Sequence, residues 1–85
     1  MHRTTDNFWQ CYHALPQEVR SRADRAFELL RENPKHPSLH FKKIGTFWSA
    51  RVDLTHRALA IEDANDFIWV WIGTHDEYER LIQGR

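Results

Sequence analysis

The sequence has a single cysteine and no long apolar run. Cys11 cannot form an internal disulfide, so nothing indicates an oxidising compartment. The opening Met-His-Arg-Thr-Thr lacks the apolar stretch of a signal peptide, and the longest apolar run, Phe67–Ile72, is far too short to cross a bilayer. We therefore expect a cytoplasmic protein with no membrane association. Because 85 residues provide for one compact core, residues 1–85 are predicted to form a single domain.

The chain also lacks a net charge, since twelve Lys or Arg residues balance twelve Asp or Glu residues. Nucleic-acid-binding domains tend to be basic, so a neutral sum argues against that class of partner. The charges are nevertheless unevenly spread. Segment 35–57 holds five Lys or Arg residues and one Asp, whereas segment 58–79 holds six acidic residues and no Lys or Arg. The sequence thus predicts a molecule with one basic region, unless the two signs interleave in space.

Two amphipathic helices are predicted in the first part of the chain. Residues 4–6 offer good N-cap side chains before apolar residues that recur at helical spacing up to Leu15. Pro16 suits the start of a second helix, which must stop before Asn33-Pro34 because the residue before a proline avoids helical dihedral angles.

After this turn the period changes to that of β-strands. Four runs rich in β-branched and aromatic residues follow, at 39–44, 47–54, 56–62 and 67–72, and the tail from His75 to Gln83 has helical character. We predict an α+β fold in which two N-terminal helices pack on one face of a four-stranded antiparallel sheet and a short C-terminal helix follows.

Alternation within the run 47–54 separates a core side from a polar side. The core side is predicted to hold Trp48, Ala50, Val52 and Leu54. Arg51 has the opposite parity and should therefore point away from the two helices, onto the open face of the sheet.

Two arginines could form a phosphate clamp on this open face. Arg51 and Arg57 lie on neighbouring strands of a hairpin centred near Thr55, and two guanidinium groups side by side bind a phosphate well. Arg57 shares its parity with two residues that look like core, so a bulge near Asp53 or Thr55 could be needed to reset its direction. The structural alternative is a pair of solvated strand arginines.

A histidine and a tyrosine complete the candidate site. His75 follows the most apolar run and its glycine, and an imidazole there can donate or accept a proton near neutral pH. Tyr78 lies three residues later on the same helical face, so both side chains can address one spot. The alternatives are a helix cap for His75 and a core anchor for Tyr78.

Other chemistries have weaker support in the sequence. The histidines at positions 36, 40, 56 and 75 suggest zinc, but no pair has the spacing of a known metal site. Cys11 and His13 would point to different faces of a helix, which argues against a nucleophile pair. Trp69 and Trp71 share one side of a predicted strand and could stack on bases, but we expect both in the core. We expect no metal and no cofactor.

Four short motifs occur in a fixed order along the chain. They are NPKHPSLHFKK at 33–43, WSARV at 48–52, HRAL at 56–59 and WIGTHDEY at 71–78. Each is weak alone, but their ordered combination resembles toxins of the RelE/ParE superfamily, over about Leu15 to Ile82.

The resemblance implies the toxin half of a type II toxin-antitoxin pair, neutralised by a cognate antitoxin protein. Some members of this superfamily cut mRNA, usually in the ribosome and without a metal, by attack of a ribose 2′-hydroxyl on the adjacent phosphate. By position, it implies that Arg51 and Arg57 stabilise the phosphate in the transition state and that His75 acts as general acid or base, with Tyr78 assisting. The expected function is a metal-independent mRNA endoribonuclease.

Two features depart from the superfamily pattern. Many members begin with a strand that pairs into the sheet, whereas Met1–Asp6 is short and polar, so we expect this strand to be missing or replaced. The lysine-rich strand of the ribosome-dependent nucleases is also thinned. Lys42 and Lys43 would bind the RNA backbone, and Lys42 is the better candidate to face outward because it shares parity with His40. A gyrase-inhibiting toxin and an inactive binding module with the same fold remain open.

Overall fold

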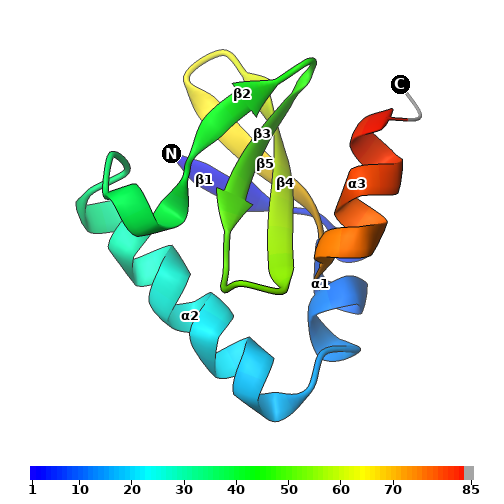
Figure 1. The fold of residues 1–85 in the computed structure, drawn as a ribbon. Coiled ribbons are helices and arrows are strands. Elements are labelled where there is room, and N and C mark those ends of the chain that lie inside the picture. The colour runs from blue at the N-terminus through cyan, green and yellow to red at the C-terminus, as the bar shows by residue number, and fades with distance from the viewer. Residues whose placement is uncertain (84–85) are drawn as a thin grey trace.

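The fold is seen in a computed structural model that describes residues 1–83 (Figure 1). The elements in chain order are β1 (His2–Thr4), α1 (Asp6–His13), α2 (Gln17–Glu32), the 3-10 turn η1 (Pro37–Leu39), β2 (Lys42–Ile44), β3 (Phe47–Arg51), β4 (His56–Asp63), β5 (Asp66–Thr74) and α3 (His75–Gln83). The strands form one sheet in the order β1-β5-β4-β3-β2. The predicted α+β class is confirmed, and the two helices, the four later strands and the C-terminal helix follow one another as predicted. The sheet differs from the prediction, because β1 precedes the helices and makes it a mixed sheet of five strands.

The additional strand is β1, which runs parallel to β5. The Phe67 amide donates a hydrogen bond to the Met1 carbonyl at 2.8 Å, and Arg3 forms ion pairs with Asp63 and Asp66. The His2 ring lies against Phe67 and accepts a hydrogen bond from the Trp69 indole at 3.0 Å. The expectation that this strand is missing or replaced is therefore wrong, since backbone pairing and ion pairs hold a polar segment that carries no apolar pattern.

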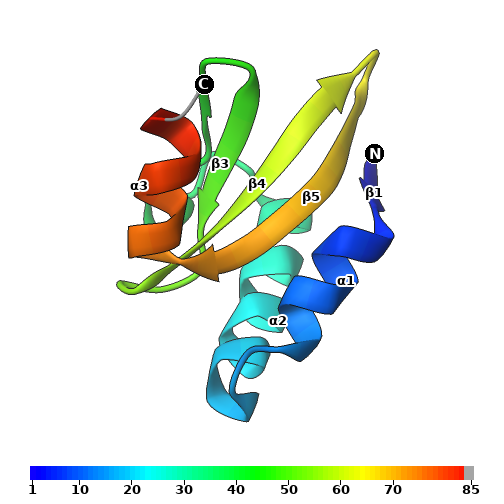
Figure 2. The ribbon, with the colours of Figure 1, turned by 90° about the vertical axis from the view of Figure 1, so that its right-hand side faces the viewer.

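Helices α1 and α2 begin and end close to where the sequence predicts. The Thr5 hydroxyl accepts a hydrogen bond from the Phe8 amide at 3.2 Å and caps α1. Helix α2 buries Val19, Ala23 and Leu30 at helical spacing and ends at Glu32. Figure 2 shows both helices on one side of the sheet and α3 on the other.

The two faces of the sheet differ in composition. Ala50 pairs with Ala58 across β3 and β4, and both are buried in the core beneath α1 and α2. Because side chains alternate along a strand, the next pair, Arg51 and Arg57, points to the opposite face, which α3 partly covers. Leu54, predicted to be a core residue, is 76% exposed because β3 ends at Arg51 and the hairpin loop begins there.

The parity of Arg57 is explained without a bulge in the hairpin. The β3–β4 register is uninterrupted from Phe47 to Arg51, so Arg57 pairs directly with Arg51 and shares its face without a register change between the two strands. Leu59 has the same parity as Arg57 and is only 1% exposed. The face that carries the arginines therefore has a small apolar floor of its own, beside α3.

A register shift does occur between β4 and β5. Leu59 pairs with Trp71 whereas Ala60 pairs with Trp69, so Val70 is an extra residue in β5. Trp69 and Trp71 therefore lie on opposite faces, and the expectation that they share one side is wrong. Trp69 is buried beneath α1 and α2, and the Trp71 indole lies over Gly73, where a Cβ atom would come within 2.4 Å of Trp71 Cζ2.

Ala64, in the tight β4–β5 turn, has a φ of 56°, in the left-handed region that L-residues rarely adopt. We expect Ala64→Gly to raise the free energy of unfolding by about 0.5–1 kcal/mol, because glycine adopts this conformation without a steric cost. Urea denaturation would measure the change.

The matched control is Ala14→Gly, since Ala14 caps α1 with an ordinary right-handed φ of −78°. The control should lower stability, because glycine there adds only conformational freedom to the unfolded chain. A loss of stability in both variants would contradict the strain at Ala64.

Candidate functional site

A pocket of about 300 Å³ lies between α3 and the face of the sheet that carries Arg51 and Arg57. It is lined by His40, Lys42, Ile44, Ser49, Arg51, Arg57, His75, Tyr78, Glu79 and Ile82. Five of the six residues selected from the sequence therefore lie around one hollow.

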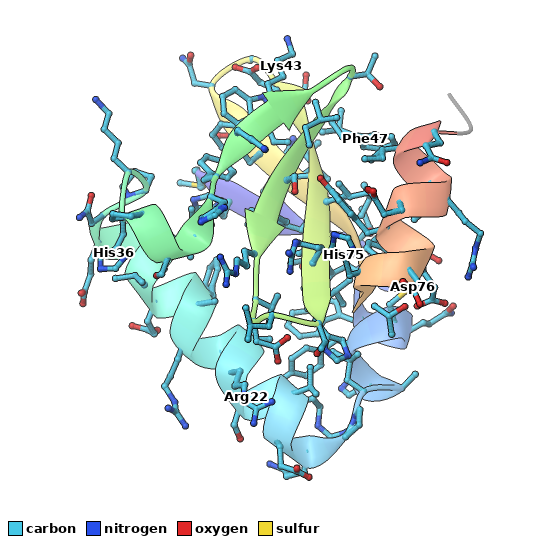
Figure 3. The ribbon with its side chains drawn as sticks, in the orientation of Figure 1. Arg22, His36, Lys43, Phe47, His75 and Asp76 are labelled. Carbon is cyan, nitrogen blue, oxygen red and sulfur yellow. The ribbon has the colours of Figure 1, made fainter. Side chains whose placement is uncertain are left out.

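Lys43 is the exception among the predicted residues. It pairs with Trp48, whose side chain packs against the core beneath the N-terminal helices, so the Lys43 side chain has the opposite parity to the pocket residues. Figure 3 shows Lys43 at the far end of the sheet from His75. The preference for Lys42 as the outward-facing lysine agrees with this geometry.

Arg51 and Arg57 occupy directly paired positions of β3 and β4. Nη1 of Arg57 donates hydrogen bonds to the carbonyl oxygens of Asp53 at 2.6 Å and His56 at 2.9 Å, which fix the guanidinium at the edge of the loop. Burial, followed by the nearby charge of Arg51, lowers the pKa of Arg57 from its usual value. Arginine stays charged in proteins, so the fold holds two like charges together, and a bound anion would relieve their repulsion.

The β3–β4 loop that anchors Arg57 is organised by Asp53. Its carboxylate accepts hydrogen bonds from the Thr55 amide at 2.8 Å and the Thr55 hydroxyl at 3.0 Å, and it lies 3.2 Å from both His56 Nδ1 and Arg22 Nη1. Partial burial raises the pKa of the Asp53 carboxyl, but hydrogen bonds from Thr55, His56 and Arg22 outweigh this effect and lower the pKa to about 2. The loop is thus held by an ionised carboxylate.

His75 is fixed by the start of α3. The Thr74 hydroxyl accepts a hydrogen bond from the Glu77 amide, and the Glu77 carboxylate accepts hydrogen bonds from the amide and hydroxyl of Thr74, so the two residues form a capping box. The bonds from Thr74 lower the pKa of Glu77. The His75 amide donates to the Thr55 carbonyl at 2.8 Å, which ties α3 to the same loop.

Tyr78 and His75 lie side by side on α3, with ring centroids 5.6 Å apart. Tyr78 is only 6% exposed and forms part of the wall of the pocket. This burial also agrees with the alternative role predicted from the sequence, in which Tyr78 anchors α3 to the core. The imidazole is more accessible than the phenol, which makes His75 the better placed of the two to meet a ligand.

Besides Ile44 and Ile82, three polar residues of the pocket were not selected for it from the sequence: His40, Ser49 and Glu79. His40 Nε2 lies 3.2 Å from Arg51 Nη1, although the two residues are eleven positions apart. The signal available in the sequence was the shared parity of His40 and Lys42. Ser49 is buried in the floor, and Glu79 brings a carboxylate close enough to Arg57 to act on its charge.

Among residues 1–83, no group of three His, Cys, Asp or Glu side chains is arranged to hold a metal ion. None of the helices in the same part of the chain is both long and apolar enough to pass through a bilayer.

Comparisons with known proteins give a fold but no close relative. No protein-family model matches the sequence, and no curated protein is significantly similar to it. Solved structures do match. The fold is that of RelE/ParE-type toxins. The RelB–RelE antitoxin-toxin complex of Methanococcus jannaschii has a chain with a TM-score of 0.72 at 13% identity, covering 93% of this chain and 96% of that one.

Two further toxin structures have the same RelE/ParE-type fold. YafQ of E. coli strain BL21(DE3) matches with a TM-score of 0.69 at 12% identity, over 92% of this chain and 96% of that one. The toxin-antitoxin complex RelBE2 of Mycobacterium tuberculosis matches with a TM-score of 0.62 at 22% identity, over 88% and 96% of the two chains. The resemblance seen in the sequence motifs is thus supported by the three-dimensional fold.

The low pKa of Asp53 generates a prediction about stability and pH. Because the folded-state pKa is about 2 and the ordinary value is 3.8, the stabilisation is fully present above about pH 4 and is lost as the pH falls through 2. We expect Asp53→Asn to lower the free energy of unfolding by about 1–2 kcal/mol at pH 7, and the difference from the wild type to shrink below pH 4.

Urea denaturation at a series of pH values would measure this difference. Glu32→Gln is the control, because Glu32 is an exposed carboxylate at the end of α2, and it should change stability by less than about 0.5 kcal/mol. If the free energy of unfolding of Asp53→Asn lies below that of the wild type by the same amount from pH 7 to pH 2, the charge of Asp53 is not what stabilises the loop.

Proposed function

We propose that this protein is the toxin of a type II toxin-antitoxin system and that it cleaves mRNA, free or on the ribosome, without a metal. The observation that carries the proposal is the pairing of Arg51 with Arg57 in one pocket with His75. Two guanidinium groups can hold a phosphate that gains charge during cleavage, and an imidazole can move the proton that bond breaking requires.

The pocket supplies the parts of a ribose-assisted cleavage. The attacking 2′-hydroxyl and the scissile phosphate belong to the RNA, so the protein needs only to bind the phosphate and transfer protons. Arg51 and Arg57 would bind the non-bridging oxygens, Lys42 would hold the adjacent backbone, and His75 would protonate the leaving 5′-oxygen. Tyr78 would assist by holding the imidazole of His75 in place.

A cognate antitoxin is the proposed protein partner. The Methanococcus jannaschii and Mycobacterium tuberculosis structures of this fold are antitoxin-toxin complexes. The basic pocket offers a surface that acidic side chains of an antitoxin would complement, at Lys42, Arg51 and Arg57. Binding there would block the proposed site directly.

Arg57→Ala tests the phosphate clamp. We expect cleavage of RNA by the purified protein, with ribosomes present, to slow by roughly 100-fold or more, because the lost interaction strengthens in the transition state. The assay is run in excess chelator, and the products should carry a cyclic phosphate. Arg57→Lys keeps the charge but loses the bidentate geometry of the guanidinium, so its cleavage rate should lie between those of the wild type and Arg57→Ala.

The control for the clamp is Arg25→Ala, an exposed arginine on α2, across the sheet from the pocket. Circular dichroism and the urea midpoint report whether Arg57→Ala folds, since Arg57 also bonds to loop carbonyls. A folded Arg57→Ala protein that cuts RNA at the normal rate would refute the clamp.

His75→Gln tests cleavage against the gyrase-directed alternative. Glutamine keeps hydrogen-bonding capacity but cannot transfer a proton, so we expect the variant to lose RNA cleavage and toxicity while it still binds the antitoxin. The measurements are growth after induction, message integrity and co-purification with the antitoxin. If the variant remains toxic with intact messages and damaged DNA, a gyrase inhibitor is the correct assignment; growth unaffected by the wild-type chain favours an inactive module.

A further inference from the structure

His40 has a backbone conformation that needs an explanation. Its φ of 44° lies in the left-handed region, which residues other than glycine adopt infrequently, although asparagine, aspartate and histidine are enriched there. The turn Pro37–Leu39 imposes this conformation, since the His40 amide donates to the Pro37 carbonyl and Leu39 is almost fully buried. The strain is thus maintained by packing, and strained residues of this kind are often found at functional sites.

The strained turn places the His40 ring against Arg51. Nε2 of His40 lies 3.2 Å from Nη1 of Arg51. A guanidinium group can only donate hydrogen bonds, so Nε2 must be the acceptor. The lone pair of His40 Nε2 is therefore directed at the arginine pair.

His40 and His75 reach the arginine pair on the same face of the sheet, from opposite flanks of the β3–β4 hairpin. His40 precedes the edge strand β2, whereas His75 follows β5, and β3 and β4 lie between these strands. Both rings line the same pocket. Figure 1 shows this arrangement, with η1 and β2 on one side of β3 and β4 and the start of α3 on the other.

We infer that His40 is the general base of the reaction, paired with His75 as the general acid; this rests on the proposed endoribonuclease function. When RNA binds, a phosphate oxygen replaces His40 as acceptor for the Arg51 N–H, which frees the lone pair of Nε2. Nε2 then takes the proton of the 2′-hydroxyl while the 2′-oxygen bonds to phosphorus. The bond from phosphorus to the 5′-oxygen breaks, and that oxygen receives the proton of His75. The products are a 2′,3′-cyclic phosphate and a 5′-hydroxyl, and solvent restores both rings.

The other groups of the pocket fit the base role less well. Lys42 is a cation in its ordinary state and has no lone pair to offer. Tyr78 is buried in the wall, and Glu79 lies on α3 beside His75, on the side of the leaving group. The charged and titratable groups that face His40 across the pocket are Lys42, Arg51, Arg57, His75, Tyr78 and Glu79.

The first experiment is the pH dependence of single-turnover cleavage, with ribosomes present, for the wild type and His40→Gln. The wild type should give a bell-shaped profile, because one imidazole must be neutral and the other protonated. Glutamine still offers an acceptor to Arg51 but cannot take a proton. We expect His40→Gln to be slower by about 100-fold or more and to lose the acidic limb of the profile.

The second experiment assigns base and acid by changing the leaving group. A short RNA whose scissile 5′-oxygen is replaced by sulfur has a leaving group that needs no protonation. His75→Gln should cleave this substrate nearly as fast as the wild type does, whereas His40→Gln should stay slow. His13→Gln, on α1 across the sheet from the pocket, is the control for loss of a histidine.

The outcomes separate this inference from the proposed function. If the wild type cuts no RNA, the endoribonuclease function fails and the inference fails with it. If the wild type cuts RNA and His40→Gln is equally active, His40 only positions Arg51 and the inference alone is overturned. It is also overturned if the sulfur substrate rescues His40→Gln, because His40 would then be the acid.

Discussion

The carboxylate of Asp53 holds together the parts of the molecule that form the pocket. It binds Thr55 in its own loop, His56 at the start of β4 and Arg22 on α2, while the Asp53 carbonyl accepts a hydrogen bond from Arg57. The Thr55 carbonyl in the same loop receives the amide of His75. One short loop therefore fixes a helix on one side of the sheet, the clamp arginine, and the start of the helix on the other side. A partly buried carboxylate stabilises a loop only if hydrogen-bond partners offset the cost of removing its charge from water, and Asp53 has such partners in Thr55, His56 and Arg22.

The same loop explains how two like charges can be kept together. Burial and mutual repulsion both disfavour a charged Arg57 beside Arg51, and the backbone carbonyls of the loop compensate by accepting two of its hydrogen bonds. The charge of the whole chain is zero, but the acidic residues that balance the arginines lie largely elsewhere, with Asp63 and Asp66 paired to Arg3 at the β1 edge. A chain with a net charge of zero can therefore still contain a local binding site for an anion.

The regular parts of the fold could be predicted from the sequence because each follows from a local pattern. Helix α2 has apolar residues at helical spacing and a stop at Asn33-Pro34, and the alternation in β3 correctly sends Arg51 to the open face. Strand β1 could not be predicted, because three polar residues are held by backbone pairing and by charges distant in sequence. The bulge at Val70 was equally hidden, since a run that is apolar on both faces gives no sign of a change in register.

The site shows the same division between patterns and tertiary contacts. Arg51, Arg57, His75 and Tyr78 could be selected because each stands at a defined place relative to a strand or helix. His40 stands in a turn, and its contact with Arg51 depends on a left-handed φ and on the burial of Leu39, neither of which a sequence pattern expresses. Sequence patterns therefore miss a residue such as His40, whose position depends on a strained backbone conformation. The surrounding packing must stabilise that strain, and residues strained in this way are often found at functional sites, which agrees with a role for His40 in the chemistry of the pocket.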